Sequence, residues 1–140
     1  LEERQDIVYR GAEAGAPDKE PPPAAQGSHR REVEPSAVLL FRYSALTFNG
    51  HRIHYDRRYA TEVEGYPGLV VHGPLLATLL LNFAAAIRGA APSSFAFRSL
   101  STLFDDDPVR LHAREDGERL KLWTARDGAP LAMSAEAAWS

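Results

Sequence analysis

One segment constrains the fold more than any other, the apolar run GPLLATLLLNFAAAIRG at residues 73–89. Pro74 suits the first position of a helix, and Gly89 directly after Arg88 is a helix stop signal, so the run predicts a single helix. Its apolar residues run almost all the way round, as in a helix that is buried on most sides. The rest of the chain must therefore fold so as to enclose it.

Strand-like runs account for most of the remaining sequence. Three β-type runs follow the helix, and the last folds back at Asp127-Gly128, a hairpin signal, so that it counts as two strands. Before the helix, SAVLLFRYS predicts a buried strand, and Asp56 is expected to cap a short helix, RRYATEV. An antiparallel sheet curled around one helix buries such a helix best, so we predict an α+β fold.

The first 32 residues differ in composition from the rest. Residues 1–10, LEERQDIVYR, predict one short strand, which is not stable alone and must pair with another. Residues 11–32 are rich in Pro, Ala, Gly and charge, which predicts an extended linker. The globular domain is therefore expected to span residues 33–140.

Charge and cysteine content exclude several classes of protein. The formal net charge of −3 gives no electrostatic case for binding nucleic acid. The absence of cysteine excludes disulfides, Fe–S clusters and cysteine-ligated zinc, and it fits a reducing compartment. The longest apolar run, residues 74–86, is well short of the ~20 residues of a membrane span. We expect a soluble, cytoplasmic protein without nucleic-acid or membrane partners.

Two of the five histidines lie in one irregular segment, FRYSALTFNGHRIHYD. An imidazole with a pKa near ~6.5 can move a proton either way at neutral pH, which makes His54 a candidate acid or base, although a lone histidine is more often structural. His51 and His54 form an H-x-x-H pair, which is weak evidence for a metal without a clear third ligand. Arg52 could meet a carboxylate or phosphate, although an exposed salt bridge is the more common role. Asn49 with Gly50 is also an ordinary turn signal.

The stretch SALTFNGHRIHYDRRYATEVEGYPGLVVHGPLLATLLL resembles the MaoC-like hydratase/dehydratase family of the hotdog fold. The family motif Asp-x-Asn-Pro-x-His-x-Asp aligns with Asn49 to Asp56, and His72-Gly73 opens the central helix. The form found here is closer to the two-hotdog dehydratases, which include hydroxyacyl-thioester dehydratases and mesaconyl-type hydratases. The resemblance covers residues 35–140 and implies a hotdog fold, an antiparallel sheet wrapped around one central apolar helix.

The resemblance also implies reversible hydration of an enoyl thioester. In that reaction a base activates water, and a donor holds the thioester oxygen as it gains enolate character. His54 would be the acid/base, Asn49 would position the water, and the amide of Gly73 at the helix start would polarise the carbonyl. The family has aspartate where this chain has Asn49, and asparagine cannot accept a proton, so His54 would carry the whole proton transfer.

Further expectations follow from the same resemblance. His51, Arg52 and His72 are candidate substrate-binding residues, and Arg98 and Arg110 could touch the phosphates of CoA. The resemblance implies no metal or redox cofactor, because the CoA or acyl-carrier-protein thioester of the substrate itself acidifies the α-carbon. Residues 1–10 look like the closing strand of a preceding hotdog, so we expect a homodimer or pairing with an N-terminal hotdog half.

Two other functions stay open at this point. Hotdog thioesterases generally place a carboxylate on the central helix or opposite it, and residues 73–88 contain no Asp or Glu. The domain could also be a non-catalytic hotdog that binds acyl-CoA or plays a structural part. Turnover of an enoyl thioester would separate hydration from both.

Overall fold

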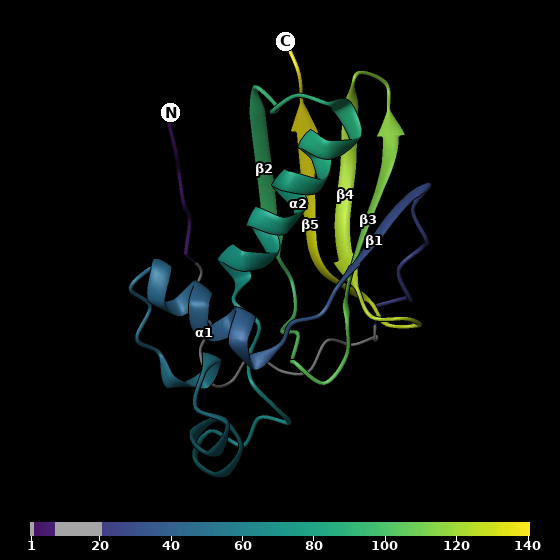
Figure 1. The fold of residues 1–140 in the computed structure, drawn as a ribbon. Helices are drawn as coiled ribbons and strands as arrows, with labels where there is room; N and C mark the ends of the chain where they lie inside the picture. The colour runs from purple at the N-terminus through teal and green to yellow at the C-terminus, as the bar shows by residue number, and fades with distance from the viewer. Residues whose placement is uncertain (1, 8–20) are drawn as a thin grey trace.

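The computed structural model describes residues 2–7 and 21–140. A five-stranded antiparallel sheet with strand order β1-β3-β4-β5-β2 curls around one face of a long helix, α2 (Figure 1). This arrangement confirms the predicted α+β architecture. The elements of the sheet and its helix are β1 (His29–Val33), α2 (Gly73–Arg88), β2 (Ser94–Ser99), β3 (Val109–Asp116), β4 (Arg119–Ala125) and β5 (Leu131–Ala138).

Helix α2 has the predicted bounds. It starts at Gly73 with Pro74 in its first turn, and it ends at Gly89, whose φ of 71° is a left-handed conformation that glycine adopts without strain. Its sheet-facing side is buried, whereas Thr78 and Asn82 on the other side are exposed. The helix is therefore enclosed by the sheet on one side rather than on most sides as predicted. The buried α2 residues are Leu75, Leu76, Ala77, Leu80, Phe83 and Ala84.

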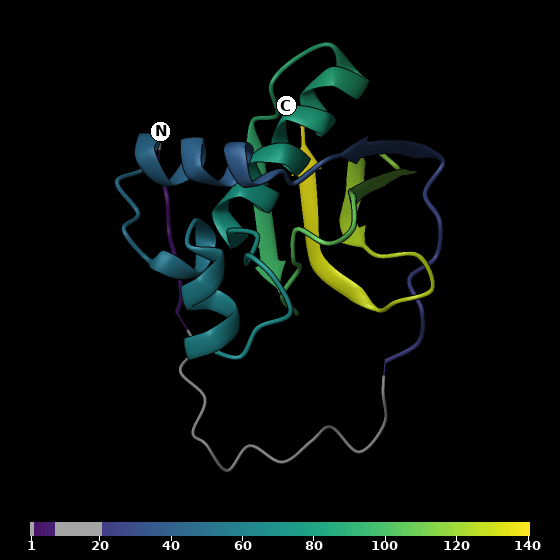
Figure 2. The ribbon, with the colours of Figure 1, turned by 60° about the horizontal axis from the view of Figure 1, so that its bottom comes forward.

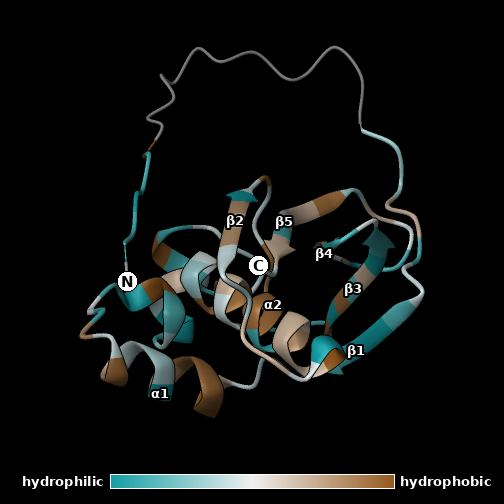
Figure 3. Ribbon diagram, turned by 90° about the horizontal axis from the view of Figure 1, so that it is seen from above, coloured by the Kyte–Doolittle hydropathy of each residue, from teal (hydrophilic) through white to brown (hydrophobic). Residues whose placement is uncertain are grey.

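The C-terminal strands form two hairpins, and the one at Asp127-Gly128 was predicted. β3 and β4 pair antiparallel, and β4 returns into β5 through Asp127-Gly128, where Gly128 has a φ of 70°. Alternation places Leu122 opposite both Ala113 and Ala135, and all three are buried with α2 in the core. In Figure 3, hydrophobic residues colour much of α2 and parts of the sheet, whereas β1 is mostly hydrophilic.

The predicted strand at residues 36–44 is wrong, because this segment is a helix, α1 (Ala37–Leu46). Ser36 caps it by accepting a hydrogen bond from the Leu39 amide at 3.2 Å. Only Leu40 and Ser44 are buried, one helical turn apart, so the apolar run is not a continuous core segment. A short apolar run fits a helix or a strand equally well. Ser36, a residue type that favours the N-terminal cap of a helix, was the sequence signal that could have identified the helix.

The folded part also begins earlier than the expected boundary at residue 33. β1 begins at His29, inside the expected linker, and pairs antiparallel with β3. Ahead of it, Gly27 lies so close to the backbone of Ala113 that a Cβ would be 2.6 Å from the Ala113 carbonyl oxygen. Of the expected strand at residues 1–10, residues 2–7 form no regular element, and residues 8 and 9 of its apolar tip lie outside the described residues, as do residues 11–20 of the expected linker.

The chain between the two helices forms a compact loop beyond the N-terminal end of α2 (Figure 2). It contains a 3₁₀ turn, Arg52–His54, and a helical turn that ends in a π-helix, Tyr59–Val63. Asp56 Oδ1 accepts from the Tyr59 amide at 3.0 Å, so Asp56 caps this second turn as predicted. No helix among the described residues is both long and apolar enough to cross a membrane.

Candidate functional site

His54 is held between the loop and the start of α2. It ends the 3₁₀ turn and is only 8% exposed. Its Nδ1 lies 2.7 Å from the carbonyl oxygen of Val70, and the amide of Val70 in turn donates to the carbonyl of Ile53 at 3.0 Å. Because a carbonyl can only accept, Nδ1 carries the proton, and in the neutral ring Nε2 keeps its lone pair. The fold therefore presents His54 in the tautomer that a base requires at Nε2.

His72 packs against His54 as a second buried ring. The two rings stack with centroids 3.7 Å apart and an interplanar angle of 16°. His72 is 1% exposed, and its Nε2 lies 2.8 Å from the hydroxyl oxygen of Ser44 on α1. The ring of Tyr43, also on α1, meets His72 edge-on at 4.9 Å. The sequence motif singled out His72 but neither Ser44 nor Tyr43, because the segment that carries them was expected to be a strand.

Burial keeps both histidines neutral at neutral pH. Burial lowers the pKa of His54. The hydrogen bond to the Val70 carbonyl favours the charged ring and opposes this shift, but its effect is smaller. Burial, together with repulsion from His54, lowers the pKa of His72 to about 4. A neutral ring stacked on the candidate base does not compete with it for a proton.

Asn49 follows a strained turn at the end of α1. Phe48, directly before it, has a φ of 54° and is 96% exposed, which is an uncommon conformation for a bulky residue. The Asn49 amide donates to the carbonyl of Ser44 at 2.9 Å, and its side-chain Oδ1 accepts from the His51 amide at 3.0 Å. This is the turn geometry that an Asn-Gly pair favours. It orients the side chain so that the NH₂ group is the part left to bind another molecule.

Gly73 occupies the first position of α2, and His72 is the cap residue. The first amides of a helix have no acceptor within it and carry partial positive charge. A Cβ built at Gly73 would meet only the hydroxyl of Ser99, at an ordinary 3.9 Å. Crowding therefore does not require a glycine here, and the residue is half-buried with an amide that has no acceptor within the helix.

The other predicted residues lie outside the buried pair. Arg52 donates to Asp56 Oδ2 at 2.7 Å and 3.1 Å and lies 4.2 Å over the ring of Tyr59, so it already has partners within the loop. His51 is exposed, with its ring edge-on to His54 at 5.8 Å. In residues 2–7 and 21–140, no three potential ligands from His, Cys, Asp and Glu cluster closely enough to hold a metal ion.

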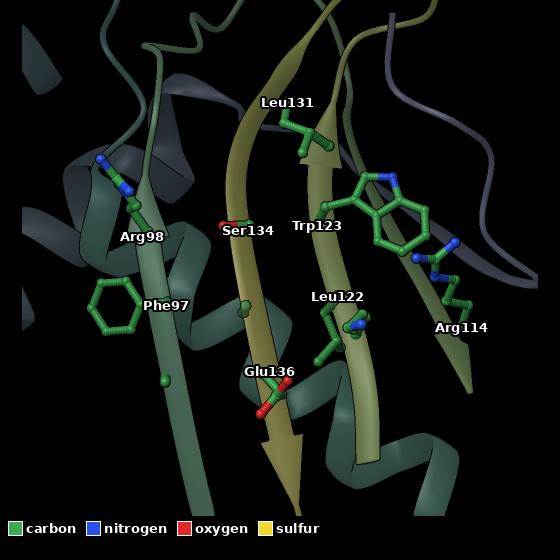
Figure 4. A pocket seen from close by; sticks show the side chains of 11 residues that line it. Phe97, Arg98, Arg114, Leu122, Trp123, Leu131, Ser134 and Glu136 are labelled. Carbon is green, nitrogen blue, oxygen red and sulfur yellow. The ribbon is translucent and has the colours of Figure 1, made fainter. Parts of the chain in front are cut away.

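A hollow of about 440 Å³ lies elsewhere, on the face of the sheet that points away from α2 (Figure 4). Arg98, Trp123 and Glu136 line it, whereas none of the six predicted site residues does. Arg110 is tied to carboxylates, with ion pairs to Glu32 and Asp107. Neither candidate for CoA phosphate contact, Arg98 or Arg110, therefore lies with the histidines.

Comparison with known proteins decides the family. The model of hydroxyacyl-thioester dehydratase type 2 matches residues 1–105, three quarters of the chain. The chain belongs to this family. Mesaconyl-C(4)-CoA hydratase of Chloroflexus aurantiacus is 50% identical over 137 residues, which cover 96% of this chain and 49% of that protein. The mitochondrial hydroxyacyl-thioester dehydratase type 2 of Schizosaccharomyces pombe is 35% identical over 90% of this chain and 42% of its own length. The chain thus spans about half the length of these curated relatives.

Solved structures confirm the hotdog fold. The (R)-hydratase of A. caviae superposes with a TM-score of 0.67 at 19% identity, covering 84% of this chain and 98% of that one. A MaoC-like dehydratase of Phytophthora capsici gives a TM-score of 0.64 at 18% identity, covering 95% of this chain and 49% of that one. At these identities the likeness establishes the fold alone.

Proposed function

We propose that this chain catalyses the reversible addition of water to an α,β-unsaturated acyl thioester, with His54 as the acid and base. One observation carries the proposal: a buried, neutral histidine whose Nδ1 is fixed on the Val70 carbonyl, which leaves Nε2 as the basic atom. The names of the family and of its relatives, all hydratases or dehydratases, support the reaction class.

The remaining chemistry is divided between Asn49 and Gly73. With its Oδ1 engaged by the His51 amide, Asn49 offers NH₂ protons to the oxygen of a water molecule. The Gly73 amide would donate to the thioester oxygen, where negative charge develops as water adds to C3. The partial positive charge at the start of α2 stabilises that same oxygen.

His54 would perform both proton transfers. Nε2 accepts a proton from water as the water oxygen bonds to C3, and the π electrons move onto the thioester oxygen to give an enolate. The protonated ring then returns its proton to C2 as the carbonyl re-forms. Since Asn49 cannot carry a proton, H and OH are delivered from the same side of the double bond, so we expect syn addition.

A short enoyl-CoA is the substrate we propose first. The relative at 50% identity is named for mesaconyl-C(4)-CoA, which puts that compound ahead of longer chains and of acyl-carrier-protein thioesters. We propose no metal or redox cofactor, because the thioester itself acidifies the α-carbon. Binding roles for His51, Arg52 and His72 stay proposals, and two of the three have an observation against direct contact, because Arg52 has partners within the loop and the ring of His72 is buried.

A second hotdog domain is the partner we propose. β2 lies at one edge of the sheet and exposes Phe97 at 46%. An open edge strand offers unpaired backbone groups to another strand. Either a second copy of this chain or an N-terminal hotdog half, with residues 1–10 as the closing strand of that half, would fit this edge. The cytoplasmic location stays a prediction.

Residues 2–7 and 21–140 carry no feature that favours either rival function over hydration. Helix α2 carries no Asp or Glu for hydrolysis of a thioester. A non-catalytic role would account for a buried histidine bonded to a carbonyl, but not for a family and relatives that are all named hydratases or dehydratases. Hydration is therefore the function that the site supports best.

The test is an absorbance assay of enoyl-thioester hydration on mesaconyl-C(4)-CoA, crotonyl-CoA and a longer enoyl-CoA. It compares this chain alone with the chain mixed with a separately produced N-terminal half taken from a relative. We expect turnover to be fastest on the short enoyl-CoA esters. An absence of turnover on every substrate in both preparations would overturn the proposal in favour of a binding module.

A further inference from the structure

A buried contact between α1 and the start of α2 lies behind the candidate base. Ser44 on α1 is 5% exposed, and its hydroxyl lies 2.8 Å from Nε2 of His72. On its face, His72 stacks against His54 at 3.7 Å. The candidate base is thus fixed at two places, by the Val70 carbonyl at Nδ1 and by the ring of His72 on its face.

The stacking geometry limits what His72 can do. Rings stacked face to face place no N–H of one toward a lone pair of the other, so His72 passes no proton to His54. Its Nδ1 is buried without a hydrogen-bond partner among the described residues, so the bond to Ser44 is the polar contact that fixes the ring. A fixed ring would restrict rotation of His54 about its own side-chain bonds.

We propose that Ser44 and His72 are positioning residues, in which the Ser44 hydroxyl holds the His72 ring and the ring holds His54 at the angle that proton transfer requires. Neither side chain takes part in the chemistry itself. The inference rests on the proposed hydratase function for its kinetic effect, but the position of His54 can be measured without a substrate.

Two substitutions of nearly equal size separate the hydroxyl from its packing. Both add a methyl group to the β-carbon of Ser44, but Ser44→Thr keeps the hydroxyl, whereas Ser44→Val also replaces the hydroxyl with a second methyl group. We expect Ser44→Val to lower kcat by between about ten-fold and about a hundred-fold, the latter being the loss when a reacting group is misplaced by about 1 Å. KM should stay unchanged, because the lost interaction does not involve substrate binding. Ser44→Thr should retain most of the activity.

Thr124, which carries a buried hydroxyl outside the candidate site, provides a control. Thr124 on β4 is fully buried, and its Oγ1 has no hydrogen-bond partner in the described part of the chain. Thr124→Val removes a buried hydroxyl in the core and should leave kcat and the pH profile as in the wild type. Loss of activity in Thr124→Val equal to that in Ser44→Val would point to general destabilisation and overturn the inference.

The deciding readout is the imidazole titration of His54 by NMR in the wild type, Ser44→Thr and Ser44→Val. If the His72 ring loosens, water reaches His54, and its titration midpoint should rise towards the ordinary histidine value, because burial is the main cause of its lowered pKa. The acid limb of kcat should move with it. A midpoint that is the same in all three proteins, or one that moves equally in the Thr and Val variants, would overturn the inference. Since the NMR titration needs no turnover, failure of the proposed function alone would leave this result intact.

Discussion

At the scale of single residues, the neighbouring residues His72 and Gly73 have different proposed roles. His72 is buried against His54, whereas Gly73 is half-buried, and a Cβ at this position would meet only the hydroxyl of Ser99. The sequence motif names both residues but does not tell which one faces the substrate. That difference becomes visible only when α1 is present to cover the ring of His72.

Gly73→Ala should separate function from stability. A Cβ at this position meets only the Ser99 hydroxyl at 3.9 Å, so the free energy of unfolding should stay the same. If a thioester oxygen approaches the amide, the methyl group stands in its way. We expect kcat/KM to fall by up to about a hundred-fold, the scale seen when an oxyanion donor is removed. Full activity in Gly73→Ala would show that this amide is not the donor.

His72 should make the folded state sensitive to acid. Burial lowers its folded-state pKa from 6.5 to about 4, so the unfolded chain binds more protons between these values. Stability is therefore complete above pH 6.5 and is lost as the pH falls towards 4, by on the order of 3 kcal/mol. Urea unfolding of the wild type and of His72→Phe across this range measures the effect, because the carboxylates titrate in both proteins. Parallel pH dependences in the two proteins would contradict the assignment.

At the scale of elements, the two helices differ in how well the sequence predicted them. Helix α2 could be predicted with its bounds, because Pro74, Gly89 and a long apolar run all indicate the same helix. The run at residues 36–44 is short, and its side-chain pattern does not distinguish a helix from a strand. The missed helix explains the missed residues, since Ser44 and Tyr43 reach His72 only from α1.

The cap at Ser36 should set the stability of α1. Its hydroxyl accepts from the Leu39 amide at 3.2 Å. Ser36→Ala should lower the free energy of unfolding by about 1 kcal/mol, whereas Ser36→Asp, which keeps an acceptor, should behave as the wild type. Chemical denaturation of the three proteins checks this. Equal losses in both variants would mean that the side chain acts through some contact other than the cap.

At the scale of the whole molecule, the sheet and helix follow from alternation and hairpin signals, but the boundaries do not. β1 was hidden in a segment whose composition is typical of a linker, because its charged residues are exposed while its backbone pairs with β3. Hydrogen bonds between distant strands leave no local signal in such a sequence. The proposed pairing with a second hotdog domain also depends on contacts at a sheet edge, which a local sequence pattern does not show.

Phe97→Lys should disrupt that pairing. Natural proteins use lysine on edge strands to prevent edge-to-edge association, because its charge cannot be buried between two sheets. We expect sedimentation to show an associated wild type and a monomeric variant. Val63→Lys, which changes an exposed apolar residue on the loop, serves as the control and should stay associated. Association that survives Phe97→Lys would place the interface elsewhere.

The central claim is that His54 performs the proton transfers, and replacing its ring tests this most directly. The measurement is kcat for hydration of the enoyl-CoA turned over best, in the wild type and in His54→Gln. We predict a loss of at least about a hundred-fold, the lower end of what general acid–base catalysis contributes, with a folded variant by circular dichroism. Turnover within a few-fold of the wild type would contradict the assignment of His54 as the acid and base.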